Sequence, residues 1–436
     1  MHTTPQSGFS HTAFESFLRA CDEPAWLLDT RRQAWQQFQD LAWPTRNNEE
    51  WQRTDIRSFN LDRFALGVDH PLELEHPQGL LSAGVELGGQ VIAANGRVIA
   101  SSLDKRWADC GVLFGSLAEG VHQADERLRP YLTCPLVSPR YDRFSALRAA
   151  CWTSGQVLHV PRGVAVSQPL HILSVLGDGA TDISHALVVL EEGAEATLLC
   201  ETDGLHESDA GLHCGALDII LRPGAHLRVV NLQNWGHGTW HFAHHKAVVE
   251  QDAVLQWTVA AMGSRLAKVN QHVELTGAGA SSQVNGVMFT GGKQHIAYHT
   301  QQHHAAPHCR SDFLYKAALQ DKSRTVWRGM IKVDPVAQRS DGYQRNDNLL
   351  LSSQVRADSI PGLEIEADNV RCTHGSTSGR VDEELIFYAR CRGFTRQEAI
   401  RAIVSGFFQQ IFDRITIESV RDALALAIGR RVRDYA

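Results

Sequence analysis

The sequence predicts a mainly β protein in which a long β core is flanked by helical segments at both ends. Three observations support this fold class. Apolar residues recur at helical spacing near the start, at strand spacing over about residues 85–362, and again at helical spacing after residue 371. We therefore expect an N-terminal helical region over residues 1–80, a β core over residues 81–370 and a C-terminal helical domain over residues 371–436.

The N-terminal helical region is indicated by two apolar series that fit the period of a helix. They comprise Phe14, Phe17, Leu18 and Cys21, followed by Trp35, Phe38 and Leu41. Pro44 interrupts the second series, because proline lacks the backbone N–H that a helix interior needs. Residues 47–50 (NNEE) then supply side-chain acceptors and negative charge, which favour the start of a further helix through Trp51.

The β core contains short apolar strands that are separated by similar small turns. Four turn residues, Gly193, Gly224, Asp252 and Gly279, tolerate tight or left-handed backbone and lie 31, 28 and 27 residues apart. This near-regular spacing predicts stacked structural units, and a β-helix or solenoid fits it best. A β-sandwich or a cupin-like barrel would also contain short strands with glycine-rich turns, so both alternatives stay open at this point.

The C-terminal helical domain has the clearest pattern in the chain. Residues 382–384 (DEE) favour the start of a helix, and Gly393 favours its end. Thr395 and Glu398 form a T-x-x-E capping box for a second helix, and a last helix begins at about Glu418. The second helix carries one broad apolar stripe, which consists of Ile400, Ile403, Val404, Phe407, Phe408, Ile411 and Ile415.

Composition and charge exclude several classes of protein. The 436 residues include 49 Asp and Glu against 42 Lys and Arg, and the resulting net charge of −7 argues against a nucleic-acid surface. No stretch of about 18 apolar residues could span a membrane, and residues 1–10 lack the features of a signal peptide, so we expect a cytoplasmic protein. Nine scattered cysteines without a C-x-x-C pair predict neither a disulfide framework nor a zinc ribbon.

Histidine is unusually abundant, with 22 residues. Two groups stand out: His241, His244 and His245, and then His295, His299, His303, His304 and His308 beside Cys309. The four-residue steps from His295 to His303 would place three imidazoles on one face of a strand or helix. Imidazole suits iron, zinc or copper, so a His-ligated, metal-dependent enzyme on a β scaffold is one alternative function. The competing interpretation is polar side chains on strand faces, since no carboxylate or second cysteine completes a known site.

Cys372 and His374 form a second candidate site. Because they lie two residues apart, an extended backbone would point both to the same face. There His374 could lower the pKa of the Cys372 thiol or join it on a metal. A catalytic Cys–His pair needs a third, orienting group, and the sequence identifies none. A buried cysteine beside a hydrogen-bonded histidine, with a structural role, is the alternative.

The apolar stripe of the C-terminal domain fits either a core of this chain or a docking surface. Adjacent Phe407 and Phe408 make the stripe wide enough to face two neighbours. The candidates for contact with a partner protein are Ile400, Val404, Phe407, Phe408 and Ile411. No G-x-x-x-x-G-K-[ST] loop is present, so the chain is not itself a P-loop ATPase, and no G-x-S-x-G elbow indicates a hydrolase.

Several longer motifs closely resemble the SufB/SufD family of iron–sulfur cluster assembly proteins. The strongest are residues 324–329 (RTVWRG), 332–337 (KVDPVA), 348–352 (NLLLS), 357–368 (ADSIPGLEIEAD) and 370–388. Further upstream, four shorter segments also resemble motifs of this family: residues 160–163 (VPRG), 190–194 (LEEGA), 305–309 (AAPHC), and Glu50-Trp51 with Thr54-Asp55. The resemblance spans nearly the whole chain, with the motifs in the order found in the family.

Within this family, residues 370–375 (VRCTHG) resemble the SufD form of the motif. The position of the SufB family's cluster-building cysteine corresponds to Asn346, and a SufB-type N-terminal cysteine cluster is absent. The resemblance implies a right-handed β-helix that is flanked by helical domains. It also implies pairing with a SufB-like paralogue through the C-terminal end of the β-helix, and binding of a SufC-like ABC ATPase through the C-terminal helices.

The function implied by the resemblance is that of a scaffold subunit, not an enzyme, in a SufB–SufC–SufD complex that supports cluster assembly and iron supply. ATP-driven closure of two SufC subunits would pull on the helical domains and rearrange the interface where a cluster forms. Cys372 and His374 match SufD residues at this interface, and His374 is the candidate metal ligand. The implied cofactor is a transient iron–sulfur cluster rather than a permanent one. A homodimer through the same β-helix end is the alternative for the isolated chain.

Overall fold

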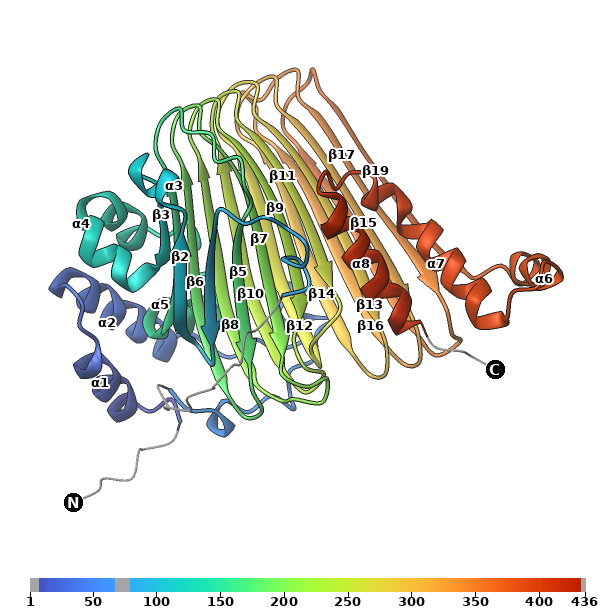
Figure 1. Ribbon diagram of the computed structural model, residues 1–436, viewed down its shortest axis with the longest axis horizontal. Coiled ribbons are helices and arrows are strands. Elements are labelled where there is room, and N and C mark those ends of the chain that lie inside the picture. The colour runs from blue at the N-terminus through green and yellow to red at the C-terminus, as the bar shows by residue number, and fades with distance from the viewer. Residues whose placement is uncertain (1–7, 67–78, 433–436) are drawn as a thin grey trace.

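A computed structural model describes residues 8–66 and 79–432 and contains a β-helix with helices at both ends (Figure 1). The mainly β fold class is therefore confirmed, and the β-helix is favoured over the sandwich and the barrel. Residues 1–7, 67–78 and 433–436 lie outside the described part of the chain. The expectation of no signal peptide concerns residues 1–10, of which 1–7 fall in that undescribed part.

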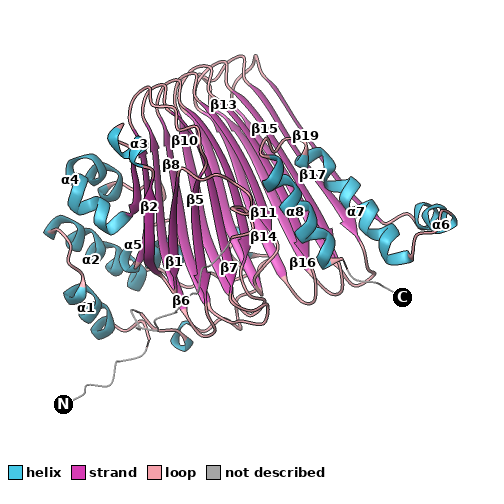
Figure 2. Ribbon diagram, in the orientation of Figure 1, coloured by secondary structure: helices cyan, strands magenta, loops and turns pink. Residues whose placement is uncertain are grey.

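The strands of the core alternate between two sheets (Figure 2). Neighbours within each stack are parallel and in register, apart from antiparallel β2 and β3 at the N-terminal end. Sheet A contains β1 (Gly89–Ala94), β2 (Arg97–Leu103), β5 (Leu170–Leu176), β7 (Glu195–Gly204), β9 (His226–Asn234), β11 (Val254–Ala261), β13 (Ser281–Thr290), β15 (Arg310–Leu319), β17 (Asp341–Leu350) and β19 (Arg371–Arg380). Sheet B contains β3 (Leu113–Ser116), β4 (Ser154–Val160), β6 (Thr181–Leu190), β8 (Leu212–Leu221), β10 (Trp240–Val249), β12 (Leu266–Leu275), β14 (His295–His304), β16 (Arg324–Val333) and β18 (Arg356–Ile365).

The interior between the sheets is filled by alternate residues of each strand, because successive side chains of a strand point to opposite faces. Trp257, Tyr298, Tyr315 and Trp327 are buried there among smaller apolar side chains from both sheets. Burial of this continuous column stabilises the stack by roughly 25 cal/mol for each Å² of apolar surface removed from water.

Helices cover the outer faces of both sheets. The helical elements are α1 (His11–Ala20), α2 (Ala25–Asp40), η1 (Glu49–Trp51), η2 (Leu61–Arg63), α3 (Lys105–Asp109), α4 (Leu117–Thr133), α5 (Arg143–Cys151), α6 (Glu383–Cys391), α7 (Arg396–Phe412) and α8 (Glu418–Arg431). Helices α1, α2, α4 and α5 pack on the outer face of sheet B, and α7 and α8 pack on the outer face of sheet A. Among the described residues, no helix is both long and apolar enough to cross a membrane.

The predicted turns form one column along the β-helix. Gly193, Gly224, Asp252 and Gly279 all have positive φ angles, between 54° and 75°. The backbone N–H of each turn residue donates to a carbonyl of the next turn in the column, as from Gly193 to Pro223 at 3.0 Å. Three further turn residues belong to the same column, namely Gly163, His308 and Arg339.

The C-terminal helices begin later than predicted. Residues 371–380 form strand β19, so the β core extends ten residues into the range expected to be helical. The polar series of this strand (RCTHGSTSGR) lacks the apolar alternation on which the boundary was based, because β19 is the last strand and little of it is buried. The helix starts themselves are confirmed, with Asp382 and Thr395 as N-caps and Gly393 at a φ of 94°.

Helices α3, α4 and α5 lie inside the range that was predicted to be β core. That part of the prediction is wrong. In α5 every residue from Phe144 to Cys151 is buried, so the helix has no polar face to reveal its period. The start of α5 does carry a local signal, since Asp142 and Ser145 form a reciprocal capping box.

Candidate functional site

No element that the structure describes caps the C-terminal end of the β-helix. Strand β18 pairs with β16 and β19 pairs with β17, and neither has a neighbour on its other edge among the described residues. Leu363 and Ile365 of β18 are 40% and 38% exposed, although their register partners Ile331 and Val333 are buried. We call this surface, formed by β18 and β19, the open end. It presents both unpaired backbone groups and apolar side chains to solvent.

Strand β19 places Cys372 and His374 on the same face, as their spacing predicted. Cys372 is the register partner of Gly342, and His374 is the register partner of Gln344. Gly342 and Gln344 are buried, and parallel neighbours in register point their side chains the same way. Both candidate residues therefore face the interior at its mouth. Cys372 is half-buried and His374 is exposed, because no further strand of the described residues covers them.

Cys372 lies close to a buried histidine that sequence spacing did not associate with it. A Cβ atom at Gly342 would lie 3.3 Å from Cys372 Sγ and 3.4 Å from His304 Nε2, so glycine lets both groups approach this point. His304 Nε2 is 2.7 Å from Ser311 Oγ, while its Nδ1 is buried without a hydrogen-bond partner in the described structure. His304 ends β14 in sheet B and reaches this point through Ser311 of β15, whose register partner is Gly342, and no local motif could indicate this contact.

The thiol of Cys372 is not activated in this chain. Partial burial raises its pKa above the ordinary value, since the side chain packs against the apolar cluster that includes Ile331 and Ala367. His374 forms no hydrogen bond or ion pair with any residue that the structure describes. The suggestion that His374 lowers the pKa of Cys372 is therefore wrong for the chain alone. The second suggestion, joint binding of a metal, stays a prediction.

Asn346, at the position that corresponds to the SufB cysteine, is a buried part of a hydrogen-bond network. Its Nδ2 donates to the carbonyl oxygen of Tyr315 at 3.3 Å. Its Oδ1 accepts from Ser359 Oγ at 2.5 Å and from Asn348 Nδ2 at 3.0 Å. The Asn346 amide is thus held by hydrogen bonds to its neighbours, and this position has no thiol that could bind a cluster.

The histidines of residues 295–308 do not converge. His295, His299 and His303 share the outer face of β14, as predicted, but neighbouring members of this series lie about 13 Å apart along an extended strand. His304 points inward, and His308 occupies a turn at a φ of 60°. Within the described residues, no three His, Cys, Asp or Glu side chains are placed to hold a metal ion. The structure therefore favours the interpretation of polar side chains on strand faces.

Most of these histidines have intramolecular roles. Burial lowers the pKa of His299 to about 2 and of His295 to about 4, and nearby cations act in the same direction. His244 Nε2 lies 3.1 Å from Asp142 Oδ2 at the start of α5. His303 Nε2 lies 2.9 Å from Asp334 Oδ2. These contacts connect the strands of sheet B to α5 and to a neighbouring turn. The imidazoles therefore do not form a common set of metal ligands.

The apolar stripe of α7 belongs to the core of this chain. Ile400, Val404, Phe408 and Ile411 are at most 3% exposed and pack against the outer face of sheet A, and Phe407 is half-buried beside them. The prediction that these five residues form a docking surface is therefore contradicted for the four buried ones. The apolar period correctly predicted a buried helix face. It does not indicate which surface covers that face, and here the covering surface is sheet A of the same chain.

The exposed apolar side chains of the helical domain lie on α6 and the turn after it. Leu385, Phe387, Tyr388 and Phe394 are 53%, 69%, 60% and 48% exposed. We call them the α6 patch. Figure 1 shows α6 projecting away from the sheets beyond the strands of the open end. An adjacent Phe-Tyr pair on a short helix was the only sequence signal for this patch.

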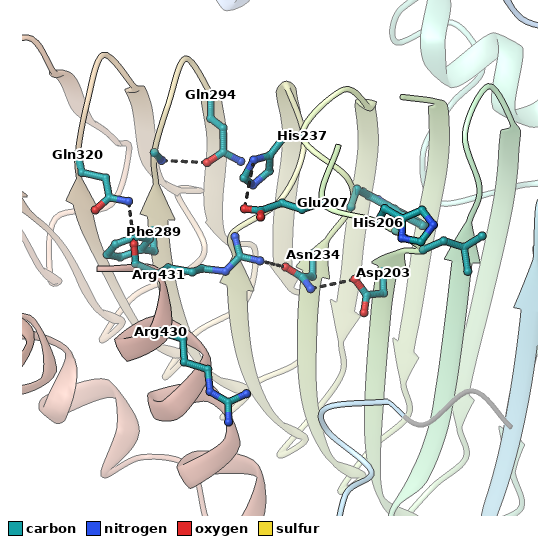
Figure 3. A pocket seen from close by; sticks show the side chains of 14 residues that line it. Asp203, His206, Glu207, Asn234, His237, Phe289, Gln294, Gln320, Arg430 and Arg431 are labelled. Carbon is teal, nitrogen blue, oxygen red and sulfur yellow. Dashed lines mark hydrogen bonds and ion pairs between the residues drawn. The ribbon is translucent and has the colours of Figure 1, made fainter. Parts of the chain in front are cut away.

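A polar cleft of about 460 Å³ lies where the end of α8 meets the ends of the sheet A strands (Figure 3). Arg431 crosses it, donating to Asn234 Oδ1 and, at 3.0 Å, to the carbonyl oxygen of Met262. Asn234 in turn donates to Asp203 Oδ1 at 2.9 Å, and burial raises the pKa of Asp203 to about 6. Gln320 Nε2 donates to the carbonyl oxygen of Arg431 at 2.9 Å. These contacts fasten the last turn of α8 to sheet A.

Comparison with known proteins relates most of the chain to one family. The family model for the SufBD core domain of SUF system FeS cluster assembly matches residues 174–407, and the model for the SufBD protein N-terminal region matches residues 15–172. An iron–sulfur cluster assembly SufBD family protein of Mycobacterium leprae is 33% identical over 296 residues, covering 66% of this chain and 74% of the relative. The iron–sulfur cluster assembly protein SufB of Bacillus subtilis is 23% identical over 429 residues, covering 95% and 91%. The chain belongs to the SufBD family of iron–sulfur cluster assembly proteins.

Proposed function

We propose that this chain is a SufD-like scaffold subunit, not an enzyme, of a cytoplasmic SufB–SufC–SufD complex that supports cluster assembly and iron supply. The observation that carries the proposal is the open end. There β18 and β19 each keep one unpaired edge in the described structure, and Leu363 and Ile365 are exposed. A surface of this kind is a template for strand pairing with a second chain.

A SufB-like paralogue is the proposed partner at the open end. A chain of the same family would bring a strand edge of the same architecture, as the full-length similarity to the B. subtilis SufB sequence supports. Its terminal strands could pair with β18 and β19 through backbone hydrogen bonds. The same contact would cover Leu363 and Ile365, so that apolar burial and backbone pairing both favour the complex.

The proposed cargo of this interface is a transient iron–sulfur cluster. Cys372 and His374 stand at the mouth of the interior, where a thiol and an imidazole supply donors that iron accepts. His374 has no partner among the described residues, so its imidazole is available as a ligand. The remaining donors would come from the partner chain.

The assignment as SufD-like rests on two residues. Asn346 takes the position of the SufB cysteine and is committed to hydrogen bonds with its neighbours. Cys372, in turn, belongs to the segment VRCTHG that resembles the SufD motif. In this proposal the chain contributes half of the assembly interface and the SufB-like paralogue contributes the other half.

The α6 patch is the proposed contact with a SufC-like ATPase. We propose this patch as the contact instead of the apolar stripe of α7, because Phe387 and Tyr388 are exposed whereas the stripe is buried. Helix α6 begins three residues after β19 ends, so a force on α6 would act directly on the strand that holds Cys372 and His374. The polar contacts of Arg431, Lys316 and Arg414 would hold the rest of the helical domain on sheet A.

Two reciprocal double variants test both contacts. After coexpression with the SufB-like and SufC-like proteins, Leu363→Lys with Ile365→Lys should lose the SufB-like protein and keep the SufC-like one. Phe387→Ser with Tyr388→Ser should do the opposite. Each variant is the matched control of the other, since both replace exposed apolar residues. Recovery of the complete complex with both variants would contradict the proposed contacts.

The role of His374 is tested in the assembled complex. His374→Ala should reduce the amount of cluster formed, measured by its visible absorbance and by iron and sulfide content, while the complex stays intact. His226→Ala, which changes an exposed histidine of β9, is the control. Cluster yields equal to those of the unaltered complex would remove His374 from the mechanism. In the absence of a SufB-like partner, chromatographic mass distinguishes a monomer from a homodimer formed through the open end.

A further inference from the structure

We propose that a pocket in the N-terminal region binds a small aromatic anion. The pocket lies between the end of α2, the segment through η1 and η2, and the start of α5, and has a volume of about 610 Å³. Figure 1 places α2 and α5 at the end of the molecule opposite β19. The pocket is thus separate from the open end, and its occupant is a different ligand from the cluster or the protein partners proposed above.

Aromatic rings form the walls of this pocket. The rings of Phe38 and Trp43 are 6.3 Å apart at an interplanar angle of 89°, and those of Trp43 and Phe59 are 5.8 Å apart at 65°. Trp43 and Phe59 are only half-buried, so part of their ring surface faces the pocket. Ring surfaces at these angles suit a planar, unsaturated group, which can stack on one ring and contact the edge of another.

Cationic side chains surround the same space. The guanidinium of Arg143 lies 4.6 Å from the ring centre of Phe38 and 4.5 Å from that of Trp43. Its Nη1 donates to the carbonyl oxygen of Leu41 at 2.6 Å, whereas its Nε is buried and has no partner in the described structure. The three arginines of the lining outnumber its two acidic residues. The excess positive charge favours an anionic ligand over a neutral or cationic one.

Thr54 supplies a second unpaired group that independently points to a ligand. This residue is 2% exposed and lines the pocket, and its Oγ1 has no hydrogen-bond partner among the described residues. An unpaired buried hydroxyl costs free energy that a bound acceptor would recover. Thr54 and Asp55 also belong to the upstream motif that begins with Glu50-Trp51, which the proposed function leaves unexplained. An oxyanion that accepts from Thr54 Oγ1 and Arg143 Nε, with its ring against Trp43, satisfies every one of these groups.

The pocket is large enough for such a compound, since small-molecule sites commonly occupy about 300–1,000 Å³. Asp55 does not repel an anion strongly, because it already accepts from Arg57 at 2.7 Å and lies 3.1 Å from Arg46. The ligand class is therefore a planar ring system that carries a carboxylate, sulfonate or phosphate.

Fluorescence titration of the full chain with 1-anilinonaphthalene-8-sulfonate tests the proposal. We expect saturable binding at one site, weakened roughly tenfold by Thr54→Val and by Arg143→Met. Thr54→Ser keeps the hydroxyl and should restore the affinity, which separates ligand binding from a folding defect. The neutral analogue N-phenyl-1-naphthylamine should bind more weakly and should not respond to Arg143→Met.

Phe387→Ser is the matched control, because it removes the most exposed ring of the α6 patch, where the same dye could also adsorb. It should leave the titration unchanged. The proposal is overturned if binding is not saturable, if Thr54→Val has no effect while Phe387→Ser abolishes the signal, or if the neutral and anionic probes bind equally. None of these results bears on the open end, since complex formation is measured separately.

Discussion

The two ends of the β-helix are completed in different ways. At the N-terminal end, antiparallel β2 and β3 are the last strands and also have one neighbour each, but Trp107 of α3 and Phe114 of β3 are buried in the interior there. Helices α1 to α5 gather around that end (Figure 1). At the C-terminal end, β18 and β19 stop with open edges, and Leu363 and Ile365 remain exposed. The chain therefore closes the interior with its own side chains at one end and leaves apolar side chains exposed at the other. The proposed pairing with a second chain depends on this uncovered end.

The largest expected difference between the ends is in stability. Phe144 of α5 is 1% exposed, and its ring lies 3.8 Å from that of Phe242 and 5.5 Å from that of Trp51. Phe144→Ala should lower the free energy of unfolding by about 3–5 kcal/mol, because it removes apolar contacts and leaves a cavity. Urea unfolding followed by tryptophan fluorescence measures the loss.

The matched change at the open end is Leu363→Ala. Since this side chain is 40% exposed, the same experiment should show a loss of less than about 1 kcal/mol. Similar losses for the two variants would mean that the two ends contribute equally to folding, contrary to the comparison.

The next difference concerns pH. The covered part of sheet B buries His299 next to Lys268, Arg328 and His272, and burial followed by these charges lowers its pKa to about 2. In the unfolded chain the pKa is about 6.5, so the unfolded state binds the proton first as the pH falls. For this residue alone, the free energy of unfolding is at its full value above pH 6.5. It should fall by about 1.4 kcal/mol for each pH unit below that, or by about 2 kcal/mol at pH 5.

His299→Gln should make the loss of stability between pH 7 and pH 5 shallower, as measured by urea unfolding at each pH. His226→Gln, at an exposed position of β9, is the control. Identical pH profiles for the unaltered chain and His299→Gln would show that this buried imidazole does not contribute to the acid sensitivity.

The smallest effect is expected inside the mouth of the open end. A methyl group at Gly342 would lie 3.2 Å from Ile331 Cγ2 and 3.3 Å from Cys372 Sγ, which is tighter than normal contact. Gly342→Ala should cost about 1 kcal/mol of stability and push Cys372 outward, so its thiol should react faster with a disulfide reagent. At Gly375, added atoms meet only ordinary contacts at 3.9 Å, so Gly375→Ala should change neither property. Unaltered thiol reactivity in Gly342→Ala would show that Cys372 is not confined by this contact.

Local features of the fold were predictable because short-range physics produces them. Thr395 and Glu398 cap α7 with side chains three residues apart, and Gly193 and Gly224 adopt left-handed backbone in their own turns. His308 and Arg339 take the same backbone in the same column of turns. Their residue types do not predict this left-handed backbone, because the hydrogen bonds between neighbouring turns impose the conformation there.

The candidate site was only partly predictable. The shared face of Cys372 and His374 follows from the two-residue period of a strand. The approach of His304 to Cys372 depends on the register of β15, β17 and β19, and residues 68 apart carry no mutual signal in sequence. The docking role of the α7 stripe was misassigned for the same reason, since apolar periodicity predicts a buried face without naming what covers it.

The sequence by itself determined the strand and helix periods, the helix caps, most of the turns, and the family to which the chain belongs. Each of these depends on residues that are neighbours along the chain or on motifs within one segment. Only the tertiary structure decided that β18 and β19 each have one unpaired edge among the described residues, that α7 is covered and the α6 patch is exposed, and that the histidines are dispersed. Burial and edge pairing depend on contacts between distant segments, so they are properties of the assembled fold and not of any one stretch of sequence.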